Sequence, residues 1–145
     1  MVKEFAIITK SAEETQNFGI EFAKKLKKGD VIALYGYLGS GKTELAKGIC
    51  KGLGVTQTVS SPTFVIVNEY SSAKFPKIFH LDLYRLKTLD DIINIGFYDY
   101  INENMLVLIE WPEHVEDLLP KNTIKIRLAY TDENENSRWI KLEIN

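Results

Sequence analysis

The sequence is poor in the residues that form covalent or metal cross-links. Its 145 residues include one cysteine and two histidines. Cys50 therefore has no partner within the chain for a disulfide, and no pair of cysteines or histidines stands at the spacing of zinc ligands. We expect neither a disulfide framework nor a structural zinc site, and we interpret Cys50 as a small apolar residue of the core.

Long apolar runs and a strong excess of one charge are also missing. No segment has the length of a membrane span, and the first nine residues, which include Lys3 and Glu4, alternate like a strand instead of a secretion signal. A net charge of −2 and an isoelectric point near 5.7 argue against a protein that binds nucleic acid only by neutralising its phosphates. The densest basic run, residues 24–28, is typical of the solvated end of a helix. We expect a cytoplasmic protein that contacts neither membrane nor DNA.

Strand and helix patterns alternate along the whole chain. Hydrophobic residues make up 45% and charged residues 26%, the balance of a globular protein, and the length suits one domain, residues 1–145. We predict strands over Val2–Ile8, Val31–Tyr35, Thr63–Tyr70, Lys77–Tyr84, Met105–Ile109, 124–128 and 140–144. We predict helices over Ser11–Leu26, over Lys42–Leu53, from Thr88 onward and over Phe97–Glu103. The last two strands alternate apolar and polar residues, which predicts an antiparallel hairpin with one wet face.

One motif joins a predicted strand to a predicted helix. Gly36 to Thr43 reads GYLGSGKT, which fits G-x-x-x-x-G-K-[ST] in the context that this motif requires. Glycines let successive backbone N–H groups face phosphate oxygens, Lys42 reaches the β- and γ-phosphates, and Thr43 offers its hydroxyl to Mg²⁺. A glycine-rich turn without a ligand is the alternative, but motif and context together favour a phosphate loop. The fold class that follows is α/β, a P-loop NTPase-like domain whose mixed, mostly parallel sheet is flanked by helices and ends in the antiparallel hairpin.

Two acidic residues follow apolar strand runs and are candidates for holding Mg²⁺ or orienting a water molecule. Alternation places Asp82 on one strand face with His80 and Tyr84. Glu110 ends the most apolar run of the chain, so we expect it at the carboxyl edge of the sheet, where open α/β folds bind ligands. A structural ion pair between Asp82 and Arg85 is the alternative role for the first acid.

Three ring side chains near these acids receive no chemical role from the sequence. His80 and His114 are single histidines, and such residues more often serve hydrogen-bonded packing than catalysis. Trp111 follows Glu110 directly and could pack near a nucleotide, but we interpret it as a core aromatic.

Sequence features outside the loop indicate which nucleotide is bound and which reaction is favoured. The guanine-reading pattern Asn-Lys-x-Asp does not occur, which favours ATP over GTP. Three arginines are present, whereas kinases of this fold clamp the transferred phosphoryl group with several, so hydrolysis is favoured. Residues 60–63, Ser-Ser-Pro-Thr, lie where nucleotide-sensing segments of P-loop proteins are found. A tight turn fixed by Pro62 is an equally supported interpretation.

Several motifs together resemble one family, the bacterial TsaE (YjeE-type) ATPases of tRNA threonylcarbamoyladenosine synthesis. The matching segments are Ser11 to Thr15, Gly36 to Thr43, SPTF at 61–64, Glu69-Tyr70, HLDLYR at 80–85 and IEWP at 109–112. The resemblance covers nearly the whole chain. It implies a feeble ATPase that joins TsaB and TsaD, uses ATP to reset that complex between turnovers, and meets tRNA indirectly through its partners.

The resemblance also implies roles for individual residues. The expected catalytic residues are Lys42, Asp82 and Glu110, and the expected metal ligands are Thr43, Asp82 and Glu110. The expected nucleotide contacts are Gly36, Gly39, Ser40, Gly41, Lys42, Thr43, Glu44, Ser61 and Thr63. Two positions depart from the family pattern: Tyr37 replaces a common Asp, and Glu44 replaces a frequent Thr. We expect Glu44 to point outward, where it still complements the positive end of the helix.

Two other functions are compatible with the same motifs. One is a nucleotide-gated interaction module in which binding without hydrolysis suffices. The other is a small-molecule or protein kinase, which would yield a phosphorylated product instead of free phosphate.

Overall fold

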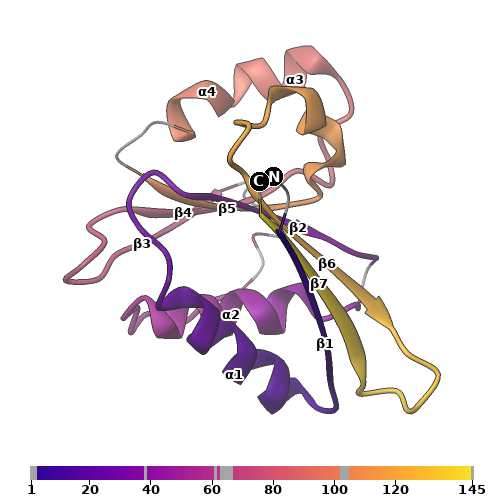
Figure 1. Cartoon of the computed structure of the whole chain (residues 1–145). Coiled ribbons are helices and arrows are strands. Elements are labelled where there is room, and N and C mark those ends of the chain that lie inside the picture. Colours follow the sequence, from indigo (N-terminus) through magenta and orange to yellow (C-terminus); the bar gives the residue numbers. More distant parts are fainter. Residues whose placement is uncertain (1–2, 38, 61, 63–66, 102–104, 145) are drawn as a thin grey trace.

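The computed structural model describes residues 3–37, 39–60, 62, 67–101 and 105–144. These residues form a seven-stranded sheet in the order β1-β7-β6-β2-β5-β4-β3 (Figure 1). The strands are β1 (Lys3–Thr9), β2 (Val31–Tyr35), β3 (Val67–Tyr70), β4 (Ile78–Asp82), β5 (Leu106–Glu110), β6 (Ile124–Tyr130) and β7 (Arg138–Ile144). The helices are α1 (Ala12–Ala23), α2 (Lys42–Gly52), α3 (Leu89–Asn94), α4 (Phe97–Tyr100) and the 3₁₀ helix η1 (Pro112–Leu118).

The four central strands are parallel and the outer pairings are antiparallel. β6, β2, β5 and β4 run in one direction, which brings their carboxyl ends to one edge of the sheet. β1 with β7, β7 with β6, and β3 with β4 pair in the antiparallel sense. The predicted mixed sheet and the C-terminal hairpin are therefore confirmed. The sequence did not indicate that β1 extends this hairpin and becomes an edge strand.

Alternating side chains of the central strands form two apolar faces. Leu34 and Leu108 pack with residues of α1 and α2 on one face. Val107 and Ile109 pack with α3, α4 and η1 on the other face. Figure 1 shows the two helical layers on opposite sides of the sheet. β2 and β5 are buried along their whole length, because helices cover both of their faces, and this accounts for their continuous apolar runs.

Side-chain caps begin α1 and α3 at the residues where these helices were predicted to start. Ser11 Oγ accepts a hydrogen bond from Glu14 N at 3.1 Å at the start of α1. Thr88 and Asp91 cap α3 reciprocally, each side chain accepting from the backbone N–H of the other. α1 ends at Ala23 instead of Leu26, because the next N–H groups bond to the carbonyl three residues back in a tightened turn. In the part of the chain that the structure describes, no helix is long and apolar enough to span a membrane.

Two predicted segments extend beyond the described residues. The helix predicted over Phe97–Glu103 is the single turn α4, and 102–104 are outside the described ranges. The strand predicted over Thr63–Tyr70 is observed as β3, and 63–66 are likewise outside them. β3 and β4 pair with each other in the antiparallel sense.

A glycine lets α1 and α2 approach each other closely. A Cβ atom at Gly48 would lie 2.1 Å from the Gln16 carbonyl oxygen, so no side chain fits there. Cys50, two residues further along α2, is fully buried, as expected for an apolar residue of the core. The packing of α2 against α1 fixes where α2 begins, at the loop that follows β2.

Candidate functional site

The loop after β2 curls at the carboxyl edge of the sheet before α2 begins. Ser40 N–H donates to Tyr37 O at 3.0 Å, which closes a tight turn within the loop. Gly39 and Gly41 have φ angles of +79° and +101°, a region that side chains disfavour, so the curl depends on glycine at both positions. Gly41 is also the N-cap of α2, which therefore starts without a side-chain cap. The N–H groups of a first helical turn have no acceptor within the helix itself, and together with the helix dipole they favour an anion here.

Lys42 begins α2, and only 5% of its surface is exposed. Its Nζ lies 3.8 Å from the centre of the Trp111 ring and has no hydrogen-bond partner among the described residues. Burial lowers the pKa of Lys42, and the negative charge of Glu110, with two further carboxylates, opposes that shift. A buried ammonium group without an acceptor is unfavourable. The position is therefore suited to an anion that accepts hydrogen bonds from Nζ.

Asp82 and Glu110 stand side by side at the ends of β4 and β5, where they are partners across the parallel pair. Glu110 is 3% exposed, whereas Asp82 is half-buried and accepts a hydrogen bond from Tyr84 N at 3.0 Å. Burial raises the pKa of Asp82, the charge of Glu110 raises it too, and Lys42 opposes the rise. Adjacent carboxylates repel each other unless a cation or a proton lies between them. The structure thus brings the two predicted acids together near Lys42.

His80, to which the sequence assigned no chemical role, lies behind Glu110. Its Nε2 is 2.6 Å from Glu110 Oε2, and its side chain is fully buried. The imidazole also packs against the Tyr70 ring, with 6.2 Å between ring centres, and the Tyr70 hydroxyl donates to Ser60 O at 3.2 Å. A series of contacts therefore runs from Glu110 to the start of the predicted nucleotide-sensing segment. Alternation had placed His80 on the face of Asp82, but the register of β4 against β5 was needed to identify its partner.

Trp111 follows Glu110 in the chain, and its ring contacts Lys42 from an unusual backbone conformation. Its φ of +57° is the one positive value recorded for a non-glycine residue within the described ranges. Such a conformation is strained by about 1–3 kcal/mol and is often found at functional sites. The indole packs against the Tyr84 ring, with 4.8 Å between centres, as well as lying under Lys42 Nζ. Trp111 is thus half-buried at the rim of the site, and not only the core aromatic that the sequence suggested.

Glu44 turns towards α1, in agreement with the expectation that it points outward. Its carboxylate accepts a hydrogen bond from Gln16 Nε2 and forms an ion pair with Lys47 Nζ at 3.4 Å. Its predicted place among the nucleotide contacts therefore rests on its backbone N–H. Ser61 and Thr63, the other predicted contacts beyond the loop, lie outside the described residues.

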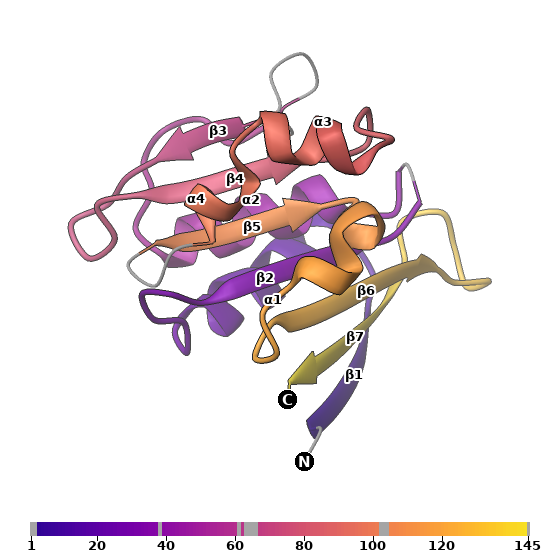
Figure 2. The same ribbon diagram turned by 90° about the horizontal axis from the view of Figure 1, so that it is seen from above.

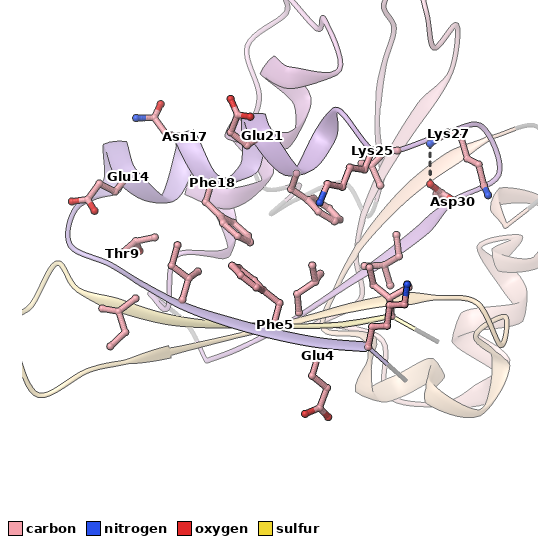
Figure 3. A pocket seen from close by; sticks show the side chains of 18 of the residues that line it. Glu4, Phe5, Thr9, Glu14, Asn17, Phe18, Glu21, Lys25, Lys27 and Asp30 are labelled. Carbon is pink, nitrogen blue, oxygen red and sulfur yellow. Dashed lines mark hydrogen bonds between the residues drawn. The ribbon is translucent and has the colours of Figure 1, made fainter. Parts of the chain in front are cut away.

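A groove of about 880 Å³ lies elsewhere, between the edge strand β1 and α1 (Figure 3). Phe5 and Phe18 stack within it with ring centres 6.4 Å apart, and 53% of Phe5 is exposed. The described residues that line the groove include none of the predicted site residues. This groove is therefore distinct from the loop between β2 and α2.

Comparison with known proteins identifies the family. Residues 9–140 match the sequence profile of the family described as threonylcarbamoyl adenosine biosynthesis protein TsaE. The tRNA threonylcarbamoyladenosine biosynthesis protein TsaE of Bacillus subtilis is 35% identical over 134 residues, which are 92% of this chain and 83% of that protein. The protein of the same name from Nostoc sp. is 40% identical over 131 residues, 88% of this chain and 80% of its own length. A crystal structure of Bacillus subtilis YdiB superposes with a TM-score of 0.79 at 31% identity, covering 99% of this chain and 87% of that one. The chain therefore belongs to the TsaE family of tRNA threonylcarbamoyladenosine biosynthesis.

Proposed function

We propose that this chain binds ATP together with Mg²⁺ on the loop from Gly36 to Thr43 and hydrolyses it in support of tRNA threonylcarbamoyladenosine synthesis. The observation that carries the proposal is the buried Lys42 ammonium group, which has no acceptor among the described residues. Nucleotide phosphates are strong acceptors for such a group. The uncapped start of α2 adds backbone donors and positive potential at the same place.

The residues of the loop would have different roles in phosphate binding. Lys42 would donate from Nζ to β- and γ-phosphate oxygens while Trp111 holds its side chain from below. Gly39 and Gly41 would let the phosphates approach the main chain closely. Glu44, held by Gln16 on α1, would keep its carboxylate away from them.

The residues at the sheet edge fit Mg²⁺ that arrives with the nucleotide. Mg²⁺ in proteins is commonly held by one or two carboxylates together with substrate phosphates and water. Thr43 supplies a hydroxyl from the first turn of α2, and Asp82 and Glu110 supply two adjacent carboxylates. When bound, the ion would neutralise charge that develops on the transferred phosphoryl group.

The two acids differ in their surroundings, so we assign them different tasks. Asp82 is half-buried, and its pKa is raised by burial and by the neighbouring Glu110 charge, as expected for a carboxylate that awaits a cation. Glu110 is buried and held by His80 through Oε2, which fixes its orientation. A carboxylate held in this way is suited to orient the water that attacks the γ-phosphate.

A calorimetric titration with Mg-ATP tests the phosphate site. Lys42→Ala should weaken binding at least a hundredfold, because a charge-assisted contact to two phosphates is lost. Lys51→Ala is the matched control, since Lys51 is an exposed lysine at the other end of α2. Unchanged affinity in Lys42→Ala would show that the site is wrongly placed. If the wild-type chain binds no Mg-ATP, alone or with TsaB and TsaD, the proposed function is wrong.

Glu110→Gln distinguishes hydrolysis from the two alternatives. The variant should bind Mg-ATP but release phosphate at least a hundredfold more slowly, and modification by the complete complex should stop after the first turnover. Modification that continues at the normal rate without hydrolysis would favour a nucleotide-gated interaction module. A phosphorylated product formed with an added acceptor would favour a kinase.

We further propose that the chain works in the cytoplasm with TsaB and TsaD, and that these partners hold most of the tRNA. The net charge of −2 supports this division, because tRNA binding depends largely on cationic side chains. Phosphate release should therefore increase when purified TsaB and TsaD are added. Equal rates with and without them would contradict the assignment of partners.

A further inference from the structure

The C-terminal hairpin contacts the phosphate loop through two residues that face each other across β6 and β7. Tyr130 ends β6, Arg138 begins β7, and they are register partners. Arg138 Nη2 donates to Gly39 O at 3.2 Å. A Cβ atom at Gly39 would lie 2.4 Å from the Tyr130 hydroxyl oxygen, so the tyrosine lies directly against the loop. Figure 2 shows the β6–β7 turn and the loop between β2 and α2 at the same edge of the sheet.

The order of the strands indicates which end of a bound nucleotide faces this hairpin. β2, which leads into the loop, has β5 and β4 on one side and β6 on the other. Asp82 and Glu110, which belong near the γ-phosphate, end β4 and β5. The hairpin stands on the opposite side of β2. It therefore faces the nucleoside end of a nucleotide whose phosphates lie in the loop.

The pair offers the chemistry that a nucleoside requires. Tyr130 is 54% exposed, and the Arg138 guanidinium carbon lies 4.5 Å from the centre of its ring. Aromatic rings and guanidinium planes both stack on nucleobases, and such stacking contributes about 1–3 kcal/mol per base. Tyr130 thus offers a partly exposed aromatic ring beside the loop.

The pair is held in place before any nucleotide arrives. Arg138 Nη1 donates to Glu135 O at 2.6 Å and to Ser137 O at 2.9 Å, while Nη2 bonds to the loop. These backbone carbonyls fix the guanidinium group, and the guanidinium group in turn orients Tyr130. A surface that is already ordered loses less entropy on binding.

We propose that Tyr130, oriented by Arg138, is the nucleoside-binding surface of this chain, and that the base of the nucleotide stacks on its ring. The inference rests on the proposed ATP site and assigns the half of the ligand that the phosphate loop does not hold. Arg138 acts here as a positioning residue for Tyr130 and for the Gly39 carbonyl.

The test compares Mg-ATP with inorganic Mg-tripolyphosphate, which has the phosphates and lacks the nucleoside. Both are titrated calorimetrically into the full chain carrying Tyr130→Ala or Tyr130→Phe. Tyr130→Ala should weaken Mg-ATP binding about tenfold and change tripolyphosphate binding less than twofold. Tyr130→Phe, which keeps the ring, should bind Mg-ATP within twofold of the wild type. Tyr98→Ala is the matched control, since Tyr98 is a 55% exposed tyrosine on α4, and it should have no effect.

Each of the remaining outcomes would contradict the inference for a different reason. If Tyr130→Ala weakens both ligands equally, Tyr130 acts through the loop and not on the base. If Tyr130→Ala leaves Mg-ATP affinity unchanged, the base binds elsewhere, while Lys42-dependent tripolyphosphate binding keeps the proposed phosphate site intact. If the wild type binds neither ligand, the proposed function falls and this inference with it. Should circular dichroism show that Tyr130→Ala is unfolded, Tyr130→Leu, which keeps apolar bulk without a ring, must show the same selective loss.

Discussion

His80 Nε2 lies 2.6 Å from Glu110 Oε2, and both side chains are buried. The two residues come from neighbouring parallel strands, and His80 reaches forward along β4 past the level of its own register partner, Leu108. Glu110 is therefore held by its neighbour on one side while Asp82 stands beside it at the strand ends. A hydrogen bond from a buried imidazole fixes the orientation of a carboxylate that solvent does not reach.

His80→Ala should lower kcat for ATP hydrolysis about tenfold or more and leave Mg-ATP affinity within about twofold, because the variant frees the orientation of Glu110 without touching the phosphate loop. It should also lower the free energy of unfolding by about 1–3 kcal/mol, since a buried acceptor loses its partner. Steady-state phosphate release, calorimetry and urea unfolding measure the three quantities.

The matched variant for this prediction is His80→Gln, whose side-chain amide can still donate to Glu110. It should recover part of kcat relative to His80→Ala. If the glutamine variant is as slow as the alanine variant although both fold, the hydrogen bond to Glu110 is not the cause of the loss.

Cys50 should make the protein less stable at alkaline pH. Burial raises the pKa of its thiol from an ordinary 9.0 to about 12. Between these values the unfolded chain releases the proton while the folded chain keeps it, so stability falls as pH rises from about 9. From pH 7.5 to pH 10, the wild type should lose about 1 kcal/mol more of its unfolding free energy than Cys50→Ala does. Urea unfolding at the two pH values measures this difference, and parallel losses in the two proteins would contradict the assignment.

Gly48→Ala should weaken the packing of α1 on α2. Alanine favours a helix over glycine by about 1 kcal/mol, but the new Cβ would stand 2.1 Å from the Gln16 carbonyl oxygen, and backbone must move to admit it. We expect the clash to prevail and the free energy of unfolding to fall by about 1–3 kcal/mol. Lys51→Ala, at an exposed position on the same helix, controls for composition. A Gly48→Ala variant as stable as the wild type would show that the helices can separate without loss.

Local patterns were sufficient to predict most elements of this fold. The caps at Ser11 and Thr88, the alternation of β6 and β7, and the glycines of the phosphate loop all act within a few residues of themselves. These patterns can be recognised in the sequence because each one determines the structure of residues close to it in the chain. The order of the seven strands is different, since it depends on which faces and edges meet after the chain has collapsed.

The same distinction applies to the candidate site. Lys42 and Thr43 belong to a contiguous motif, and Asp82 and Glu110 follow apolar runs, so sequence patterns identify them. Arg138 reaches Gly39 across 99 positions of the chain, and only the pairing of β6 with β2 brings the hairpin to the loop. A periodic sequence pattern reflects only contacts between residues that are close in the chain, so it does not predict the contact of Arg138 with Gly39.

Asp82→Asn tests whether the pair of acids serves a cation or the fold. Burial and the charge of Glu110 raise the pKa of Asp82 above its ordinary 3.8, so the folded chain binds this proton more readily than the unfolded chain. The resulting destabilisation is absent at low pH, where both states are protonated, and grows as pH rises above the ordinary pKa of 3.8. Removing the charge should therefore raise the unfolding midpoint of the ligand-free protein by a few degrees at most, because solvent screens part of the repulsion at this half-buried position.

The same variant should bind Mg-ATP more weakly while its affinity for ATP in EDTA changes little, because the proposed role of the lost carboxylate is to hold the metal and not the phosphates. Thermal unfolding at pH 7 and paired titrations with and without Mg²⁺ measure both effects, and Asp117→Asn, at an exposed position, is the control. Two adjacent carboxylates, one buried and one half-buried, lower stability, so opposite changes in stability and metal-dependent binding would indicate a cation site. Loss of stability in ligand-free Asp82→Asn at pH 7 would instead assign the carboxylate to the fold.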